Sequence, residues 1–238
     1  TLKTEPMSDK FKALRAYEKQ DGRYTQSVEN KSFSDLPDNN TLIKVHYSSL
    51  NYKDALSAIG NKGVTKNYPH TPGIDAVGEI VETTSEEFNK GDEVIVSGFD
   101  LGMDTWGGFS QYIRVPDTWL IQKPERMSMK QAMSIGTAGL TAGLAASELF
   151  LNDIKDNGTI LVTGATGGLG SIALTILSRY DYKLVGVTGS EKSNGLLEKL
   201  GVDKVMSREE LKEKPEKPLL KGEFAGAIDV AGGDILAS

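Results

Sequence analysis

Residues 159–170 decide the fold, and they read Thr159-Ile-Leu-Val-Thr-Gly-Ala-Thr-Gly-Gly-Leu-Gly170. The apolar run 160–162 stops at glycines, as a buried strand of a parallel sheet does. Residues 171–178 then carry apolar side chains over a wide face and predict a helix. A further apolar run, Lys183–Thr188, predicts a second strand. Strand, glycine-rich turn, helix and strand in this order predict an α/β fold with a doubly wound parallel sheet.

The glycines of this turn indicate a nucleotide site. Ala165-x-Gly167-x-x-Gly170 matches the dinucleotide-binding fingerprint with alanine in place of its first glycine. Glycines here let the backbone approach a pyrophosphate, which the unpaired amides and positive dipole of a helix N-terminus then hold. We therefore expect the amides around Gly167 and Gly168 to bind a diphosphate. A glycine-rich turn without a ligand is the alternative.

Two other glycine-rich motifs compete with this interpretation. A P-loop needs Gly-Lys-Ser/Thr, and here Gly170 is followed directly by Ser171. Thr163-Gly164-x-x-x-Gly168-x-Gly170 also fits the short-chain dehydrogenase pattern. Those enzymes begin with this turn, whereas about 160 residues precede it here, and none of the eight tyrosines has a lysine four positions later.

The end of the second strand favours NADP(H) over NAD(H). An NAD site has Asp or Glu near this point to bind the ribose 2′-hydroxyl. This strand ends Thr188-Gly189-Ser190-Glu191-Lys192, so hydroxyls and a lysine stand where the carboxylate is expected. Such groups suit a 2′-phosphate.

Composition excludes several classes of function. The 238 residues carry a formal charge of −6 without a basic run, which argues against a nucleic-acid surface. The absence of cysteine excludes disulfides, thiolate zinc sites and cysteine nucleophiles. No signal peptide is recognisable, so a cytoplasmic protein is the simplest expectation. Residues 132–151 contain only Glu148 as a charge, but Ala, Gly, Ser and Thr dominate, and a buried helix is expected rather than a membrane span.

Short strands precede the helical part of the chain. A hairpin is predicted over 11–30 around Asp21-Gly22, and further strands follow up to Pro124, which suggests a barrel or sandwich. Helical periodicity begins at about Ser128. The sequence thus predicts two domains, 7–128 and 129–238. A six-stranded dinucleotide sheet needs two strands beyond those expected at 204–207 and 226–230, so we expect a fragment of a longer chain or a partner that covers the edge.

Five ordered motifs resemble one family, and the resemblance spans about residues 11–238. They are Ser48–Ala55, Pro72–Gly78, Trp106–Gly108, Gly136–Gly139 and Val162–Gly170. They resemble the zinc-independent medium-chain dehydrogenase/reductases, in the YhdH/YhfP-type branch of quinone-oxidoreductase-like proteins that includes acryloyl-CoA reductases. The resemblance implies a GroES-like β-barrel-type N-terminal domain and a C-terminally incomplete Rossmann domain.

The resemblance also argues against a metal site. Zinc alcohol dehydrogenases of the superfamily carry Gly-His-Glu where this chain has Gly73-Ile74-Asp75. The ligand histidine is therefore an isoleucine. Only His46 and His70 exist elsewhere, without a cysteine to complete a zinc site. We expect no metal.

Site residues follow from the resemblance, motif by motif. It implies that Tyr52 contacts the cofactor near the nicotinamide, that residues 188–190 with Arg208 surround the 2′-phosphate, and that Thr141 adds a contact. It assigns the pyrophosphate to four residues: Thr166, Gly167, Gly168 and Leu169. The family often has arginine where this chain has Ser190, and Lys192 or Arg208 would replace it.

The expected activity is hydride transfer from NADPH to the β-carbon of an enoyl thioester such as acryloyl-CoA. Protonation of the resulting enolate at its α-carbon would follow. Tyr52 is the expected proton donor or nicotinamide positioner, with Asn51 and Asp54 orienting it. Packing or helix capping is the alternative role for these residues. Quinone reduction, or cofactor binding without turnover as in crystallin-like relatives, are the other functions considered. The expected partners are a small-molecule substrate and a second copy of the chain.

Overall fold

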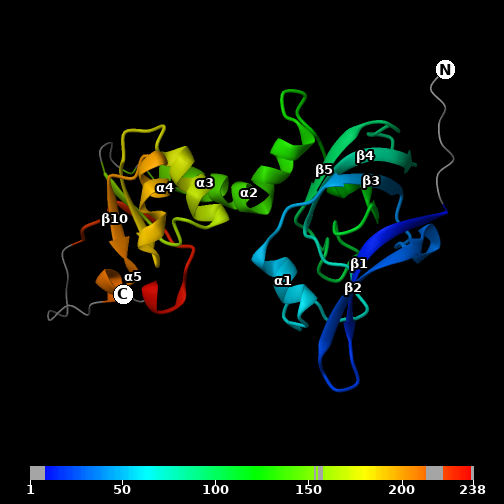
Figure 1. Ribbon diagram of the computed structural model, residues 1–238. Coiled ribbons are helices and arrows are strands. Elements are labelled where there is room, and N and C mark those ends of the chain that lie inside the picture. Colours follow the sequence, from blue (N-terminus) through cyan, green and yellow to red (C-terminus); the bar gives the residue numbers. More distant parts are fainter. Residues whose placement is uncertain (1–8, 153, 155–157, 213–221, 237–238) are drawn as a thin grey trace. The chain divides into compact units, whose positions relative to one another are not determined.

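The computed structural model describes residues 9–152, 154, 158–212 and 222–236, and the chain divides into two compact units, Thr1–Thr137 and Ala138–Ser238. Each unit has its own sheets and its own apolar core (Figure 1). The boundary between the two units lies inside a helix that begins at Met129, whereas the domain boundary expected from the sequence precedes that helix.

The first unit opens with the hairpin expected from the sequence. Strands β1 (Lys10–Glu18) and β2 (Tyr24–Ser32) pair antiparallel in one continuous register. The turn between them contains Gly22, whose φ of +77° is a conformation that suits glycine. The first half of β1 alternates between buried and exposed side chains and places Phe11 and Ala13 in the core, whereas the adjacent Arg15 and Ala16 are both buried.

A five-stranded antiparallel sheet in the order β6-β3-β4-β5-β7 forms the rest of this unit. Its strands are β3 (Thr41–Tyr47), β4 (Asp75–Thr83), β5 (Glu93–Ser97), β6 (Tyr112–Val115) and β7 (Leu120–Gln122). Their apolar side chains, with those of β1, bury a core that includes Phe11, Ile43 and Ile113. Val77 of β4 lies in a smaller cluster with Ala132 and Met133.

One short helix, α1 (Tyr52–Ala58), lies in the loop between β3 and β4. The described residues also form 3₁₀ turns at Phe33–Asp35, Asp117–Trp119, Glu191–Ser193 and Gly233–Ile235.

The second unit is a βαβ fold with a parallel sheet. Strands β8 (Thr159–Val162), β9 (Lys183–Thr188), β10 (Lys204–Ser207) and β11 (Gly226–Ile228) lie in the order β10-β9-β8-β11. Helices α3 (Gly168–Leu177), α4 (Asn194–Lys199) and α5 (Arg208–Lys212) connect them. Because β9 and β11 flank β8 on opposite sides, the strand order reverses at β8, which is where doubly wound sheets bind ligands.

Helix α2 (Met129–Leu151) is less buried than expected from the sequence. It bends at Gly136, whose φ and ψ of 50° and −157° are not helical. Small apolar residues such as Ala132, Ala142 and Ala146 are buried, but Leu140 and Leu144 are exposed. The prediction of a buried helix is therefore wrong, because only part of the helix surface packs. Among the described residues α2 alone has the length and apolar composition of a membrane span, and a soluble core helix meets the same criteria.

The charged segment 208–223 begins as α5, in which Arg208, Glu209 and Glu210 are exposed. Residues 213–221 lie outside the described residues.

Candidate functional site: a dinucleotide cradle and a polar cluster around Asp75

The turn after β8 brings its backbone very close to the start of α3. Gly164 has a φ of +58°, and its carbonyl oxygen accepts a hydrogen bond from the Gly167 amide at 2.9 Å. A Cβ at Gly170 would lie 2.4 Å from the same oxygen and 2.9 Å from the Ala165 Cα. Only glycine fits at position 170, so the fingerprint spacing reflects helix–strand contact as well as ligand approach.

Amide groups at the N-terminus of α3 remain available for a ligand. Gly167 is the N-terminal capping residue, and both Gly167 and Gly168 are exposed. The amides of Gly168 and Leu169 have no hydrogen-bond partner within the described parts of the chain. Unpaired amides and the helix dipole together form an anion site. Thr166 and Leu169 are partly buried beside them, so these four residues lie together. We call residues 166–169 the dinucleotide cradle.

The end of β9 opens into a cavity of about 450 Å³. Thr188, Gly189 and Ser190 form one wall, and the hydroxyl of Thr188 accepts a hydrogen bond from the Ser190 amide at 3.2 Å. The lining also includes Glu209 and Glu210, so the cavity contains acidic as well as hydroxyl groups. A hydrogen bond from the Ser207 amide lowers the pKa of the Glu210 carboxyl.

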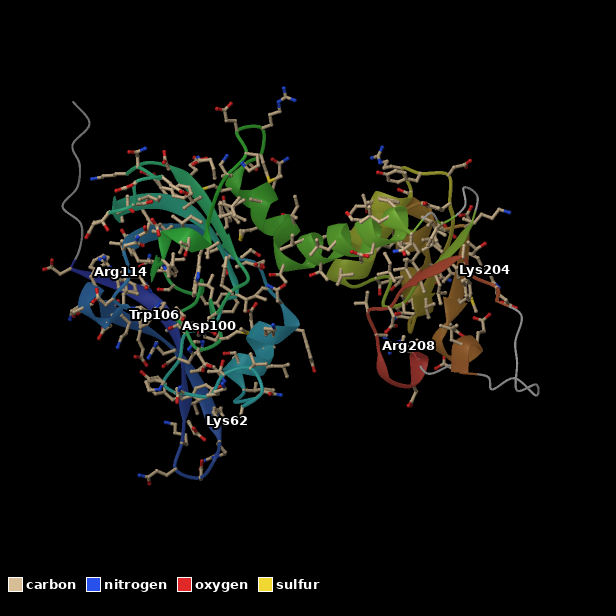
Figure 2. All side chains as sticks on the ribbon, turned by 180° about the vertical axis from the view of Figure 1, so that it is seen from behind. Lys62, Asp100, Trp106, Arg114, Lys204 and Arg208 are labelled. Carbon is tan, nitrogen blue, oxygen red and sulfur yellow. The ribbon has the colours of Figure 1, made fainter. Side chains whose placement is uncertain are left out.

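Arg208 lies against the backbone of Gly189. A Cβ placed on Gly189 would be 3.1 Å from the Arg208 Cζ, so the guanidinium rests where a side chain would otherwise stand. Arg208 is exposed at the start of α5 in the second unit, directly after the end of β10 (Figure 2). Lys192 and Thr141 are also exposed, in the 3₁₀ turn after β9 and on α2 respectively. The structure therefore brings Arg208 to the end of β9.

The three residues expected to act in catalysis lie at the start of α1, in the first unit. Tyr52 is the first residue of the helix and is 81% exposed. Asp54 is buried, and it accepts hydrogen bonds from the amides of Asn51 at 2.8 Å and Ile74 at 2.9 Å. Burial raises the pKa of the Asp54 carboxyl, although these hydrogen bonds oppose the change. Asn51 and Asp54 thus fix the helix start through its backbone, and no hydrogen bond joins either side chain to the Tyr52 hydroxyl.

Asp75 is the centre of a hydrogen-bonded cluster that the sequence interpretation missed. Its fully buried carboxylate accepts hydrogen bonds from five groups: the Ser97 hydroxyl at 2.5 Å, the Thr137 hydroxyl at 2.7 Å, the Thr137 amide at 2.9 Å, the Asn51 amide group at 3.0 Å and the Ser49 hydroxyl. Burial by itself raises the pKa of Asp75, but these donors outweigh it and lower the pKa overall. In the sequence, the signal that could have indicated this cluster was a carboxylate, Asp75, within the otherwise apolar run 74–77.

The described residues do not gather a set of zinc ligands. Ile74 stands where the resemblance to the zinc alcohol dehydrogenases would place a ligand histidine. His46 is exposed on β3, and His70 is buried beside Arg15. Within the described ranges no three His, Cys, Asp or Glu side chains form a group.

A family model called the alcohol dehydrogenase GroES-like domain matches residues 37–125. Over 233 residues the chain is 42% identical to YhfP of Bacillus subtilis, which carries the name of a quinone oxidoreductase, and the match covers 98% of this chain and 70% of YhfP. AcuI of Ruegeria pomeroyi, named as an acrylyl-CoA reductase, is 38% identical over 92% of this chain and 67% of its own.

Solved structures agree with these matches. YhdH of Salmonella enterica, crystallised in complex with NADP, has a TM-score of 0.89 and 39% identity, and the match covers 95% of this chain and 69% of YhdH. The structure of YhfP with NAD bound has a TM-score of 0.90 and 41% identity over 97% and 70% of the two chains. The chain, with its GroES-like unit and its dinucleotide cradle, therefore belongs to the zinc-independent medium-chain dehydrogenase/reductases, in the branch that contains YhfP, YhdH and AcuI.

Proposed function

We propose that the protein is an NADPH-dependent oxidoreductase that reduces the activated double bond of an α,β-unsaturated acyl-CoA such as acryloyl-CoA. The observation that carries the proposal is the set of unpartnered amides at the start of α3, placed at the reversal of strand order. The names of AcuI and of the NADP complex of YhdH support the substrate class and the cofactor.

The cradle in the second unit fits a dinucleotide. Gly167 and Gly168 are exposed, and the nearest heavy atom to a Cβ at Gly168 would be 3.5 Å away, so a diphosphate has room beside the free amides. Thr166, Gly167, Gly168 and Leu169 would hold the diphosphate, and Thr188, Gly189, Ser190, Lys192 and Arg208 would surround the adenosine ribose and its 2′-phosphate. We assign Thr141 as an additional contact. When bound, NADPH supplies the hydride.

The first unit would supply the proton. The exposed hydroxyl of Tyr52 is our candidate for the donor to the substrate α-carbon, or for the group that orients the nicotinamide. Asn51 and Asp54 support this residue by fixing the start of α1 through its backbone. Hydrogen-bond donors must stabilise the developing oxyanion of the thioester, since the reaction has no metal in this proposal.

Quinone reduction is the second candidate function, because the YhfP name points to it. The decrease in NADPH absorbance, measured at saturating NADPH first with acryloyl-CoA and then with a small quinone, distinguishes the two activities. Oxidation with acryloyl-CoA supports the proposal, and oxidation with the quinone alone supports the alternative. Binding of NADPH without oxidation by either acceptor would indicate a cofactor-binding protein without turnover, like the crystallin-like relatives.

The assembly and the compartment are further proposals. We propose a homodimer located in the cytoplasm, with a small molecule as its other partner. Light scattering at several protein concentrations tests the dimer, and a mass equal to one chain at all concentrations would contradict it.

A further inference from the structure

Thr163 and Asp229 form a hydrogen-bonded latch between the ends of β8 and β11. The Thr163 hydroxyl donates to the Asp229 carboxylate, and it accepts hydrogen bonds from the amides of Val230 at 2.9 Å and Ala231 at 3.1 Å. Asp229 also accepts a hydrogen bond from the Gly232 amide at 2.9 Å. The two side chains thus fix the backbone of residues 229–232 from both sides.

The Thr163 hydroxyl has no capacity left for a ligand. A hydroxyl has one hydrogen to donate and two lone pairs to accept with, and the latch uses all three. The residue is also buried, with 3% of its surface exposed. Any role of Thr163 in the cofactor site must therefore act through the segment that it holds.

This segment borders the crevice where the strand order reverses. β8 and β11 are parallel neighbours, so the residues that follow them emerge at the same edge of the sheet. In doubly wound sheets the end of the second strand faces the adenosine ribose, and the turn after the first strand, here β8, binds the diphosphate. Since β11 lies on the side of β8 opposite to β9, the remaining half of the dinucleotide must extend toward residues 229–233.

The glycine turn holds the same segment by close packing. A Cβ at Gly164 would be 3.2 Å from the Val230 Cβ, so the turn and the segment approach each other more closely than a larger residue permits. Gly232 and Gly233 both have positive φ values, 64° and 60°. The segment therefore passes close to the diphosphate turn, with Val230 against Gly164.

We propose that Thr163 and Asp229 are positioning residues that hold residues 229–233 against the nicotinamide half of the bound cofactor. The inference rests on the proposed function, because it requires that a dinucleotide occupies the cradle. Neither residue needs to touch the cofactor.

The test compares Thr163→Val, which has the same shape without the hydroxyl, with Thr163→Ser, which keeps it. Thr175→Val is the matched control, because Thr175 is exposed on α3 and bonds only to its own helix. In the cofactor-free protein, hydrogen exchange of the peptide covering residues 229–233 should become faster in Thr163→Val only. NADPH binding, followed by its fluorescence, should weaken about tenfold in this variant, while adenosine 2′,5′-bisphosphate, which lacks the nicotinamide half, should bind as before.

Three outcomes decide the matter. Equal NADPH affinity in the native protein and Thr163→Val, despite faster exchange, overturns the inference but leaves the proposed function standing. Equal weakening of NADPH and of adenosine 2′,5′-bisphosphate also overturns it, because the latch would then support the whole fold. A native protein that binds no NADPH overturns the proposed function itself. If Thr163→Val does not fold, Asp229→Ala removes both carboxylate acceptors of the latch, and the same criteria apply.

Discussion

At the residue scale, Tyr52 combines a fixed backbone with an exposed side chain. Two amide hydrogen bonds to the buried Asp54 fix the start of α1, while the Tyr52 ring is mostly solvent-exposed. An exposed aromatic residue on a rigid helix start contributes little to folding and can meet a ligand without rearrangement. Activity and stability should therefore respond differently to its replacement.

Tyr52→Phe should lower kcat with acryloyl-CoA by about a hundredfold if the hydroxyl donates the proton. The free energy of unfolding should change by less than about 0.5 kcal/mol, because the hydroxyl is exposed. Steady-state kinetics and urea unfolding measure the two quantities. Tyr180→Phe, a half-exposed tyrosine of the other unit, is the control. An unchanged kcat would show that the ring alone matters, and Tyr52→Ala should then raise KM for NADPH.

Arg208 should determine the preference for NADPH. Its guanidinium lies against Gly189 and is exposed, so Arg208→Gln removes a charged donor to the 2′-phosphate. KM for NADPH should rise about tenfold or more, with KM for NADH nearly unchanged. Arg179→Gln, which replaces an exposed arginine near the end of α3, serves as the control.

Glu209→Gln should lower KM for NADPH, because it removes from the cavity lining a negative charge that repels the 2′-phosphate. For either substitution, an equal change in KM for NADPH and for NADH would contradict the assignment of this region to the 2′-phosphate.

His70 should make the stability of the first unit depend on pH. Burial lowers its pKa below the ordinary 6.5, and the neighbouring Arg15 acts in the same direction. Below about pH 6.5 the unfolded chain binds a proton that the folded chain does not, so the free energy of unfolding falls as pH falls. The slope is at most about 1.4 kcal/mol per pH unit.

Urea unfolding between pH 7.5 and 5.5 (values chosen to bracket the ordinary pKa, about one unit on either side) checks this expectation. The loss of stability toward low pH should be smaller in His70→Gln than in the native protein. His46→Gln replaces the exposed histidine and should keep the native slope. Identical slopes in all three proteins would mean that His70 takes up its proton without unfolding.

At the element scale, the β8–turn–α3 unit depends on how closely two backbones approach. Gly170 lies where a methyl group would overlap the carbonyl of Gly164, and this carbonyl also accepts the Gly167 amide. The elements therefore cannot separate by a few tenths of an ångström without disturbing the phosphate cradle. The close packing and the proposed diphosphate site therefore share the same glycines.

Gly170→Ala should destabilise the second unit by about 2 kcal/mol or more, because the backbone must move to admit the Cβ. Gly143→Ala is the matched control on α2, where a Cβ would meet no atom within 4 Å. That substitution should stabilise the protein by about 0.5 kcal/mol, since it removes a helical glycine. Calorimetry measures both effects. A Gly170→Ala protein as stable as the native one would show that the turn adapts.

At the scale of the whole molecule, each of the two units has its own apolar core. The core of the antiparallel sheet includes Phe11 and Ile113, and the core of the parallel sheet includes Leu174 and Leu184. The candidate proton donor belongs to the first unit, and the dinucleotide cradle belongs to the second. Each unit should therefore respond to its own ligand.

Adenosine 2′,5′-bisphosphate should stabilise only the second unit, by about 2.7 kcal/mol at a hundred times its Kd. Both tryptophans, Trp106 and Trp119, belong to the first unit, so their emission reports on that unit alone. Calorimetry should show one transition that moves with the ligand, while the midpoint of tryptophan emission stays constant. A single transition in which both signals move together would show that the two units unfold as one.

The sequence by itself predicted most of the strands, the long helix 129–151 and the glycine turn that we propose holds the diphosphate. The turn at Asp21-Gly22, the strand 183–188 and the glycines after Val162 act through local rules, because turn chemistry and apolar periodicity depend on neighbours in the chain. The family motifs added Tyr52 and Arg208, and the structure shows both exposed, with Arg208 at Gly189.

Only the tertiary structure decided what the buried polar groups do. The donors to Asp75 come from residues between 49 and 137, and the latch joins Thr163 to residues 229–231. Such partners are distant in the chain and meet only when the strands pair and pack, so no local sequence pattern predicts their contacts. α2 was misjudged for the same reason, since burial depends on which elements pack against a helix and not on its composition alone.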